Sequence, residues 1–180
     1  MKRGIVYTGI LALLAGGITS QAQATRLGIH GVFSNAGDVE DSQLGIGGQL
    51  ELPVNPYMAV ELAVTQVGDE IEDNGATLDQ DLTSLGLSAV FRGPLGPQLE
   101  GYTLLGLNYN TFDVDTMDMD DAVGLHIGAG LNLAVAYNME LFGEYRYTFL
   151  DTDWESEISS AEGDYNYDFG VAKLGLNFLF

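Results

Sequence analysis

The feature that most constrains the fold of this chain is a regular alternation of apolar with small or polar residues, repeated in eight segments. In residues 123–133, apolar side chains occupy every odd position, whereas Gly, His and Asn occupy the even positions. Successive side chains of a β-strand point to opposite faces, so this period of two predicts strands with one apolar face. The expected strands are residues 25–34, 42–52, 57–66, 83–92, 99–110, 122–135, 139–149 and 165–180.

The connections between these segments also alternate, in length. Short turns are expected at residues 53–56, 93–98 and 136–138, and longer polar connections at 35–41, 67–82, 111–121 and 150–164. Short turns at one end and long loops at the other are typical of outer-membrane barrels, whose closure leaves no unpaired backbone edge in lipid. The pattern therefore predicts an all-β fold, an eight-stranded antiparallel up-and-down transmembrane β-barrel.

The distribution of charge supports this prediction. The chain has 26 acidic and six basic residues, and 20 of the acidic residues fall in the four long connections. We therefore expect long acidic loops outside the cell. A formal net charge of −20 argues against a nucleic-acid partner, because phosphates are neutralised by clustered Lys and Arg. The absence of cysteine excludes disulfides, thiolate metal sites and cysteine nucleophiles.

The N-terminus has the pattern of a secretory signal peptide. Lys2 and Arg3 precede an apolar stretch over residues 5–15, and Ala22 and Ala24 form a small-x-small cleavage site. We expect cleavage after Ala24, so that residues 1–24 are the signal peptide and residues 25–180 the barrel domain, exported through the periplasm. A membrane anchor is the alternative, but the apolar run is short for a span.

A soluble secreted barrel or sandwich is the alternative for the body of the chain. Glycine argues against it, because eight glycines fall in the polar phase of the expected strands: Gly45, Gly47, Gly86, Gly106, Gly124, Gly128, Gly130 and Gly175. Glycines weaken a solvated sheet face, whereas small residues are useful inside a narrow barrel.

Nine charged residues occupy the polar phase and are expected inside the barrel. We define the lumen cluster as Glu61, Glu144, Arg146 and Lys173, and the rim cluster, near the short-turn end, as Arg26, Glu51, Arg92, Glu100 and Glu140. Two interpretations of the lumen cluster remain open. It could be a gate in which ion pairs exchange, or a static network that pairs buried charges and plugs the lumen. The small interior of an eight-stranded barrel favours the static network.

Other candidate chemistry is weaker. His30 and His126 are expected to be lumen histidines, since no serine neighbours His126 along its strand and no Ser-His-acid set is visible. Carboxylates in one loop are weak candidates to bind divalent cations: Asp113, Asp115, Asp118, Asp120 and Asp121. Divalent cations could more generally bridge the acidic loops to lipopolysaccharide phosphates. We expect no cofactor and no dedicated metal site.

Residues 142–147 (FGEYRY) and 175–180 (GLNFLF) resemble segments of the OmpA/OmpX-type outer-membrane β-barrel domains of Gram-negative bacteria. The resemblance implies a monomeric integral protein of the outer membrane. It also implies an assembly signal, recognised by the barrel-assembly machinery, at Leu174, Leu176, Phe178 and Phe180. We expect no peptidoglycan-binding domain after Phe180. The expected role is non-enzymatic, in envelope structure or surface interaction, with a narrow porin-like channel for ions or small solutes as the alternative.

Overall fold

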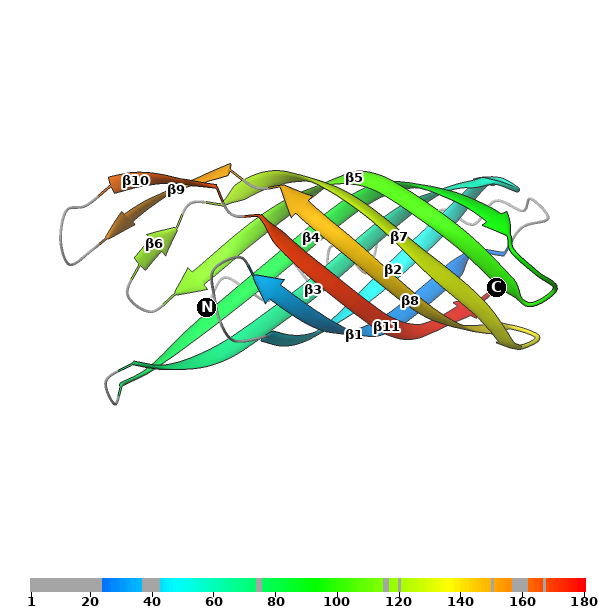
Figure 1. The fold of residues 1–180 in the computed structure, drawn as a ribbon, viewed down its shortest axis with the longest axis horizontal. Helices are drawn as coiled ribbons and strands as arrows, with labels where there is room; N and C mark the ends of the chain where they lie inside the picture. The colour runs from blue at the N-terminus through cyan, green and yellow to red at the C-terminus, as the bar shows by residue number, and fades with distance from the viewer. Residues whose placement is uncertain are drawn as a thin grey trace.

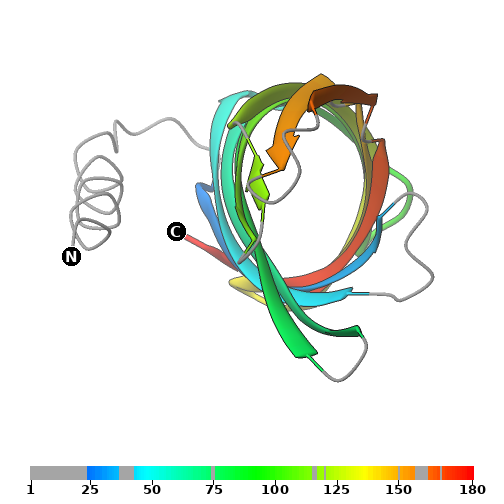
Figure 2. The same ribbon diagram turned by 90° about the vertical axis from the view of Figure 1, so that its left-hand side faces the viewer.

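The structure is a computed structural model that describes residues 24–36, 43–73, 76–114, 117–119, 121–149, 151–156, 162–166 and 168–180. Its strands form a closed barrel in which every neighbouring pair is antiparallel (Figures 1 and 2). The predicted fold class is confirmed. The eight barrel strands are β1 (Arg26–Ala36), β2 (Gln43–Asn55), β3 (Met58–Asp73), β4 (Ala76–Pro94), β5 (Leu99–Val114), β7 (Ala122–Ala136), β8 (Met139–Phe149) and β11 (Phe169–Leu179).

The short turns lie close to the predicted positions, but three of the four long connections contain strand, and the fourth, 35–41, lies mostly outside the described residues. The expected connection 67–82 is almost entirely strand, since β3 and β4 stay paired as far as Asp73 and Ala76. Three further strands also fall in expected loops or across their bounds: β6 (Met117–Met119), β9 (Asp151–Ser156) and β10 (Glu162–Asn166). Beyond the membrane both strand faces can be polar, so the apolar alternation that reveals a strand disappears.

The expected last strand, 165–180, is split in the structure. Residues 165 and 166 belong to β10, which pairs with β9, whereas β11 begins at Phe169. Asp168 lies exposed immediately before β11. In the sequence the alternation changes phase around Asp168, because Tyr165 and Phe169 are out of step with Leu174. In the structure this position is the boundary between a barrel strand and the β-structure beyond the barrel end, where β6, β9 and β10 lie (Figure 1).

The register sets how deep each residue lies in the barrel. Starting at Arg26 and crossing one strand at a time, the ladder returns to β1 at Ala36, ten residues further along. A stagger of this kind tilts the strands by roughly 35–45° from the barrel axis. The path runs through Glu51, Glu61, Ser88, Gly106, His126, Thr148 and Phe169.

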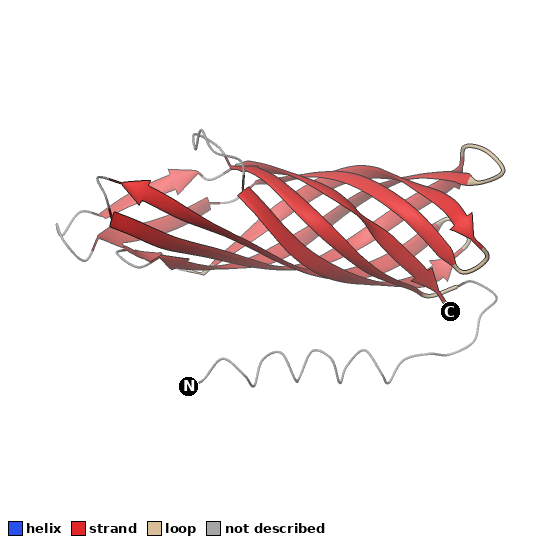
Figure 3. Cartoon of the chain, turned by 90° about the horizontal axis from the view of Figure 1, so that it is seen from below, coloured by secondary structure: helices blue, strands red, loops and turns tan. Residues whose placement is uncertain are grey.

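The two faces of the barrel wall differ as the alternation requires. Large apolar side chains such as Ile46, Leu107 and Leu174 are exposed outward, whereas the opposite phase is buried inside. Interior glycines make room for rings: a Cβ on Gly47 would collide with His30, and one on Gly106 would lie 2.7 Å from His126 Nε2. The cartoon of the described chain contains strands and loops only, and no helix of that part is long and apolar enough to span a membrane (Figure 3).

The expected signal peptide is not tested, because residues 1–23 lie outside the described part of the chain.

Candidate functional site in the barrel lumen

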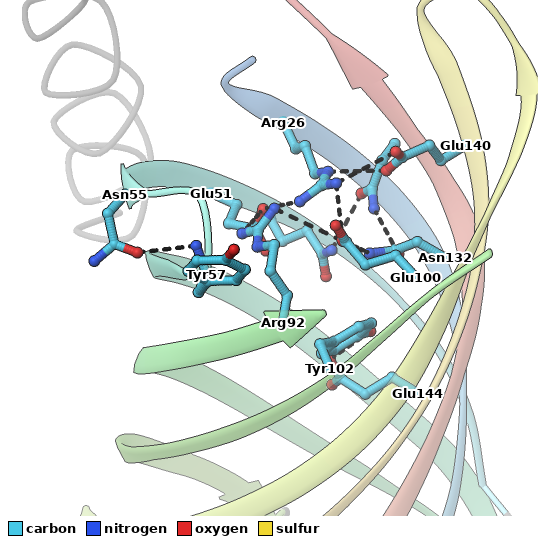
Figure 4. Close-up of polar contacts among 12 residues, drawn as sticks. Arg26, Glu51, Asn55, Tyr57, Arg92, Glu100, Tyr102, Asn132, Glu140 and Glu144 are labelled. Atoms are coloured by element: carbon cyan, nitrogen blue, oxygen red, sulfur yellow. Dashed lines mark hydrogen bonds and ion pairs between the residues drawn. The ribbon is translucent and has the colours of Figure 1, made fainter. Parts of the chain in front are cut away.

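The rim cluster is a set of ion pairs centred on Arg26, close to the short-turn end of the lumen (Figure 4). The Arg26 guanidinium donates to Glu51 at 2.9 Å, to Glu100 at 2.9 Å and to Glu140 at 2.8 Å. These three carboxylates come from β2, β5 and β8, so one side chain on β1 joins four strands. Arg92 forms a second ion pair with Glu51. All five charged residues of the rim cluster therefore meet.

Amide side chains extend the rim cluster across the lumen. Asn132 donates to Glu100 at 3.1 Å, Asn177 donates to Asn132 at 3.5 Å, and Gln49 donates to Asn177 at 3.2 Å. These three amides were not predicted from the sequence, although each occupies the inward phase of its strand. A buried carboxylate is better stabilised when its remaining lone pairs accept hydrogen bonds; Asn132 supplies such a donor to Glu100, and the other two amides hold Asn132 in place.

The four residues of the lumen cluster also meet, deeper in the barrel. Arg146 Nη2 lies 2.8 Å from Glu61 Oε1 and 2.7 Å from Glu144 Oε1, and Lys173 Nζ lies 3.3 Å from the same Glu144 oxygen. Glu61 is 1% exposed, and all four side chains are buried. Two carboxylates and two cations make the cluster formally neutral, which is the arrangement that buried charge requires.

Tyr102 was not identified from the sequence, yet it contacts the lumen cluster directly. Its hydroxyl donates to Glu144 Oε2 at 3.1 Å, the carboxylate oxygen opposite the one that Arg146 and Lys173 use (Figure 4). The ring lies over Gly130, where a Cβ would collide with the ring and hydroxyl of Tyr102. The glycine at 130 therefore lets Tyr102 cross from β5 over β7 to β8.

A serine, a histidine and an acid do come together, which corrects the expectation that no such set is visible. Ser88 Oγ lies 2.8 Å from His126 Nε2 and 3.4 Å from Glu61 Oε1. His126 reaches Ser88 across β5 because the residue between them is Gly106, which has no side chain. The acid contacts the serine, and His126 Nδ1 has no hydrogen-bond partner among the described residues, so the order of contacts is not that of a catalytic triad. Ser88 is 2% exposed.

The expectation of a polar lumen is wrong in part, because two groups of apolar side chains also face inward. One group, which we call the apolar layer, lies between the rim and lumen clusters and comprises Ala59, Val90, Tyr102, Leu104 and Phe142. The other, which we call the outer collar, lies toward the far end and comprises Val32, Val67, Leu82, Ala122, Phe169 and Val171. Single apolar residues in the polar phase interrupt the alternation only briefly, so the sequence pattern does not reveal these two groups.

The lumen contains some space and some unpaired polar atoms. A cavity of about 30 Å³, room for a few waters, is bordered by Arg146, Lys173 and His126 and reaches Val67 and Phe169 of the outer collar. Several buried polar atoms lack a hydrogen-bond partner among the described residues: both ring nitrogens of His30, and atoms of Ser34, Gln49, Asn108 and His126. Groups of this kind in native proteins are commonly satisfied by ordered water.

The remaining candidate residues are placed as follows. Leu174 and Phe180 are exposed, and Leu176 and Phe178 are half-buried. Asp121 accepts a hydrogen bond from Tyr109 at 2.5 Å. Of the other cation candidates, Asp115 and Asp120 lie outside the described residues, and the side chains of Asp113 and Asp118 are not described. Among the described residues, no group of three or more His, Asp or Glu side chains could hold a metal ion.

Comparison with known proteins identifies the family. A family model described as the outer membrane protein beta-barrel domain matches residues 8–180. The chain belongs to this family. It is therefore an outer-membrane β-barrel protein, and the lumen described above is the interior of a membrane-embedded barrel. A search of curated protein sequences found no significant match.

Solved structures share the fold of this outer-membrane protein at low sequence identity. Neisserial surface protein A is 19% identical, with a TM-score of 0.66 over 87% of this chain and 97% of that one. Ail of Yersinia pestis, solved with the heparin analogue sucrose octasulfate, is 18% identical, with a TM-score of 0.61 over 89% of this chain and 100% of that one. The outer membrane protein AlkL, solved in lipid bilayers, is 14% identical, with a TM-score of 0.63 over 92% of this chain and 94% of that one.

Proposed function

We propose that this protein is a closed, non-enzymatic barrel whose task is structural and whose interactions are made by its acidic outer end. The observation that carries the proposal is the pairing of all nine lumen charges in two clusters that tie the strands together. An ion pathway selective for one sign would favour an excess of that charge, whereas these residues sum to four cations and five carboxylates. The Ser88–His126 pair supports no enzymatic role, because it is buried among these charges.

A narrow channel is the second candidate function. The unpartnered polar atoms along the lumen and the small cavity beside the lumen cluster favour it, because both provide places for water. Current through single refolded proteins in a planar bilayer separates the two proposals, with the heat-reversible gel shift of barrels as proof of folding. The closed barrel predicts a silent, folded protein. Frequent discrete openings would instead make it a small pore.

The outer end of the barrel, where β6, β9 and β10 lie, would bind cations or cationic partners. The register sets acidic residues of neighbouring strands opposite one another, with Glu155 facing both Asp118 and Glu162, and Asp153 facing Asp164. Like charges directly opposite each other destabilise a sheet, so bound cations would stabilise this region. The same charge would repel a polyanion such as the heparin analogue bound by Ail, so we propose a basic partner or lipopolysaccharide bridged by divalent cations.

Two measurements test the proposed surface. Vesicles carrying the protein should bind polylysine and not heparin, and the binding should weaken as salt rises because exposed charges are screened. A variant in which β9 is neutralised by Asp151→Asn, Asp153→Asn and Glu155→Gln should lose most of the polylysine binding that the unaltered protein shows. Chelation of divalent cations should speed proteolysis of the outer strands. Equal proteolysis with and without the chelator would contradict the bridging role.

Assembly would depend on the C-terminal strand. We propose that the barrel-assembly machinery recognises Leu174, Leu176, Phe178 and Phe180, and that the folded protein is a monomer. Leu174 and Phe180 support this role, because both are exposed near the seam where β11 meets β1. Thr25 and Phe180 complete that seam with two backbone hydrogen bonds.

A further inference from the structure

The apolar layer defined above separates the two charge clusters on three different strands. On β8, Phe142 lies between Glu140 of the rim cluster and Glu144 of the lumen cluster. On β4, Val90 lies between Arg92 of the rim cluster and Ser88, which contacts the lumen cluster. On β5, Tyr102 and Leu104 follow Glu100 in the inward phase. On these three strands the apolar layer therefore lies between the two clusters, whereas on β2 and β3 Glu51 of the rim cluster is directly opposite Glu61 of the lumen cluster.

Phe142 closes one side of the lumen at this level. It is 0% exposed and is the largest fully buried side chain among the described residues. Its ring crosses β11 at Gly175, where a Cβ would come within 2.7 Å of Phe142 Cε1. It then meets the ring of His30 on β1 edge to face, with the ring centroids 5.9 Å apart. One side chain thus covers the wall from β8 to β1.

The other members of the layer cover the remaining wall. Ala59, Val90, Tyr102 and Leu104 form one buried cluster from β3, β4 and β5, and Tyr102 extends over Gly130 on β7. On β2, Gln49 reaches Asn177 on β11 through a hydrogen bond that passes Gly28 of β1, where a Cβ would collide with Asn177. Apolar side chains therefore cover the lumen wall on β3, β4, β5, β7 and β8 and reach β11 and β1 through Phe142, and on β2 the cover is the Gln49 amide that also extends the rim cluster.

We propose that this apolar layer, with Phe142 as its central residue, is the hydrophobic closure of the barrel and stops water and ions more effectively than the ion-paired clusters do. Charged groups hold water, and the cavity beside Arg146 and Lys173 shows that the lumen is not filled there. An apolar constriction, by contrast, blocks ions by excluding water. The inference rests on the closed barrel proposed above and assigns the residue that keeps it closed.

The test is single-channel recording of the refolded full-length mature protein and four variants, of which Arg146→Met opens the lumen cluster. Phe142→Ala removes the ring from the lumen. Phe149→Ala is the matched control, because Phe149 lies on the same strand and is exposed on the outer face. Val90→Thr replaces a methyl group by a hydroxyl at nearly constant volume and wets the layer with little disturbance. Val90→Thr therefore takes the place of Phe142→Ala in the test if Phe142→Ala does not show the heat-reversible gel shift of a folded barrel.

We expect Phe142→Ala, or Val90→Thr in its place, to show discrete openings and a mean current at least about tenfold above the background recorded with the unaltered protein, which corresponds to a barrier lower by about 1.4 kcal/mol or more. Phe149→Ala should stay silent. A folded Phe142→Ala and a folded Val90→Thr that are both silent overturn the inference and leave the closed barrel standing. Openings in Arg146→Met as frequent as those in Phe142→Ala place the closure in the ion pairs and also overturn it. Openings in the unaltered protein refute the closed barrel itself.

Discussion

Arg146 is the residue whose loss should most weaken the barrel, and Arg146→Met is the substitution that tests the role of the lumen cluster. Methionine keeps much of the apolar length of the arginine side chain but removes its charge and all its donors. Glu61 would then lose its ion pair, and Glu144 would keep only Lys173 and the hydroxyl of Tyr102. The cluster would change from neutral to one net negative charge.

The expected loss of stability follows from the distances. At about 2.8 Å and an effective dielectric constant of about 20, each Arg146–carboxylate pair has a gross Coulomb attraction of roughly 6 kcal/mol. Most of that attraction is offset by the cost of removing the charges from water. Breaking a buried pair by removing one partner typically costs about 3–5 kcal/mol, because the other charge stays buried. We expect a decrease of that size in the free energy of unfolding.

The assay is urea unfolding in lipid vesicles, followed by the gel mobility of the folded and unfolded forms. The matched control is the double variant Arg146→Met with Glu61→Gln, which leaves Glu144 and Lys173 as a neutral pair. It should recover most of the stability, since neutral replacement of a buried pair is often nearly without cost. A single variant within about 1 kcal/mol of the unaltered protein, or a double variant as unstable as the single one, would refute this reasoning.

Three further predictions concern the remaining parts of the site. Gly130→Ala should displace Tyr102 and lower stability by about 1–3 kcal/mol in the same urea assay, whereas Gly93→Ala, whose Cβ would meet nothing within 4 Å, should change it by less than about 0.5 kcal/mol. In the rim cluster, Arg26→Met should lower the free energy of unfolding more than Arg92→Met does, because Arg26 pairs closely with three carboxylates and Arg92 closely with one. Equal decreases for the two variants would contradict this ranking. Phe180→Ala should lower the folded amount in cells while leaving refolding from urea unchanged, because the substitution keeps the backbone hydrogen bonds to Thr25; slower refolding in vitro would point to packing instead.

Much of the barrel follows from local pattern. A strand that faces lipid needs apolar residues at alternate positions, so the eight barrel strands and their short turns are visible along the chain. Where the strands extend past the membrane, charged residues occupy both phases and the alternation disappears. Residues 67–82 are therefore predicted to be a loop, although β3 and β4 continue through them. The same limit hides β6, β9 and β10.

The candidate site divides in the same way. The alternation alone assigns residues such as Glu61 and Arg146 to the inside, because a charge facing lipid near the bilayer midplane costs roughly 2–4 kcal/mol. It does not say that Glu61 meets Arg146, which lies 85 residues away, or that Ser88 meets His126 across Gly106. The Ser88–His126 contact depends on the register of β4, β5 and β7, and the Glu61–Arg146 contact depends on the ten-residue stagger that is fixed when β1 closes on β11.

The sequence by itself determined which side chains face lipid and which face the lumen, since that choice depends on the position of each residue within its own strand. The tertiary structure alone decided which lumen residues meet and at what depth. It also revealed that Phe142 and its apolar neighbours lie between two layers of charge. The physical reason is that depth in a barrel is shared by residues far apart in the chain, and the register and stagger that align them are properties of all eight strands together.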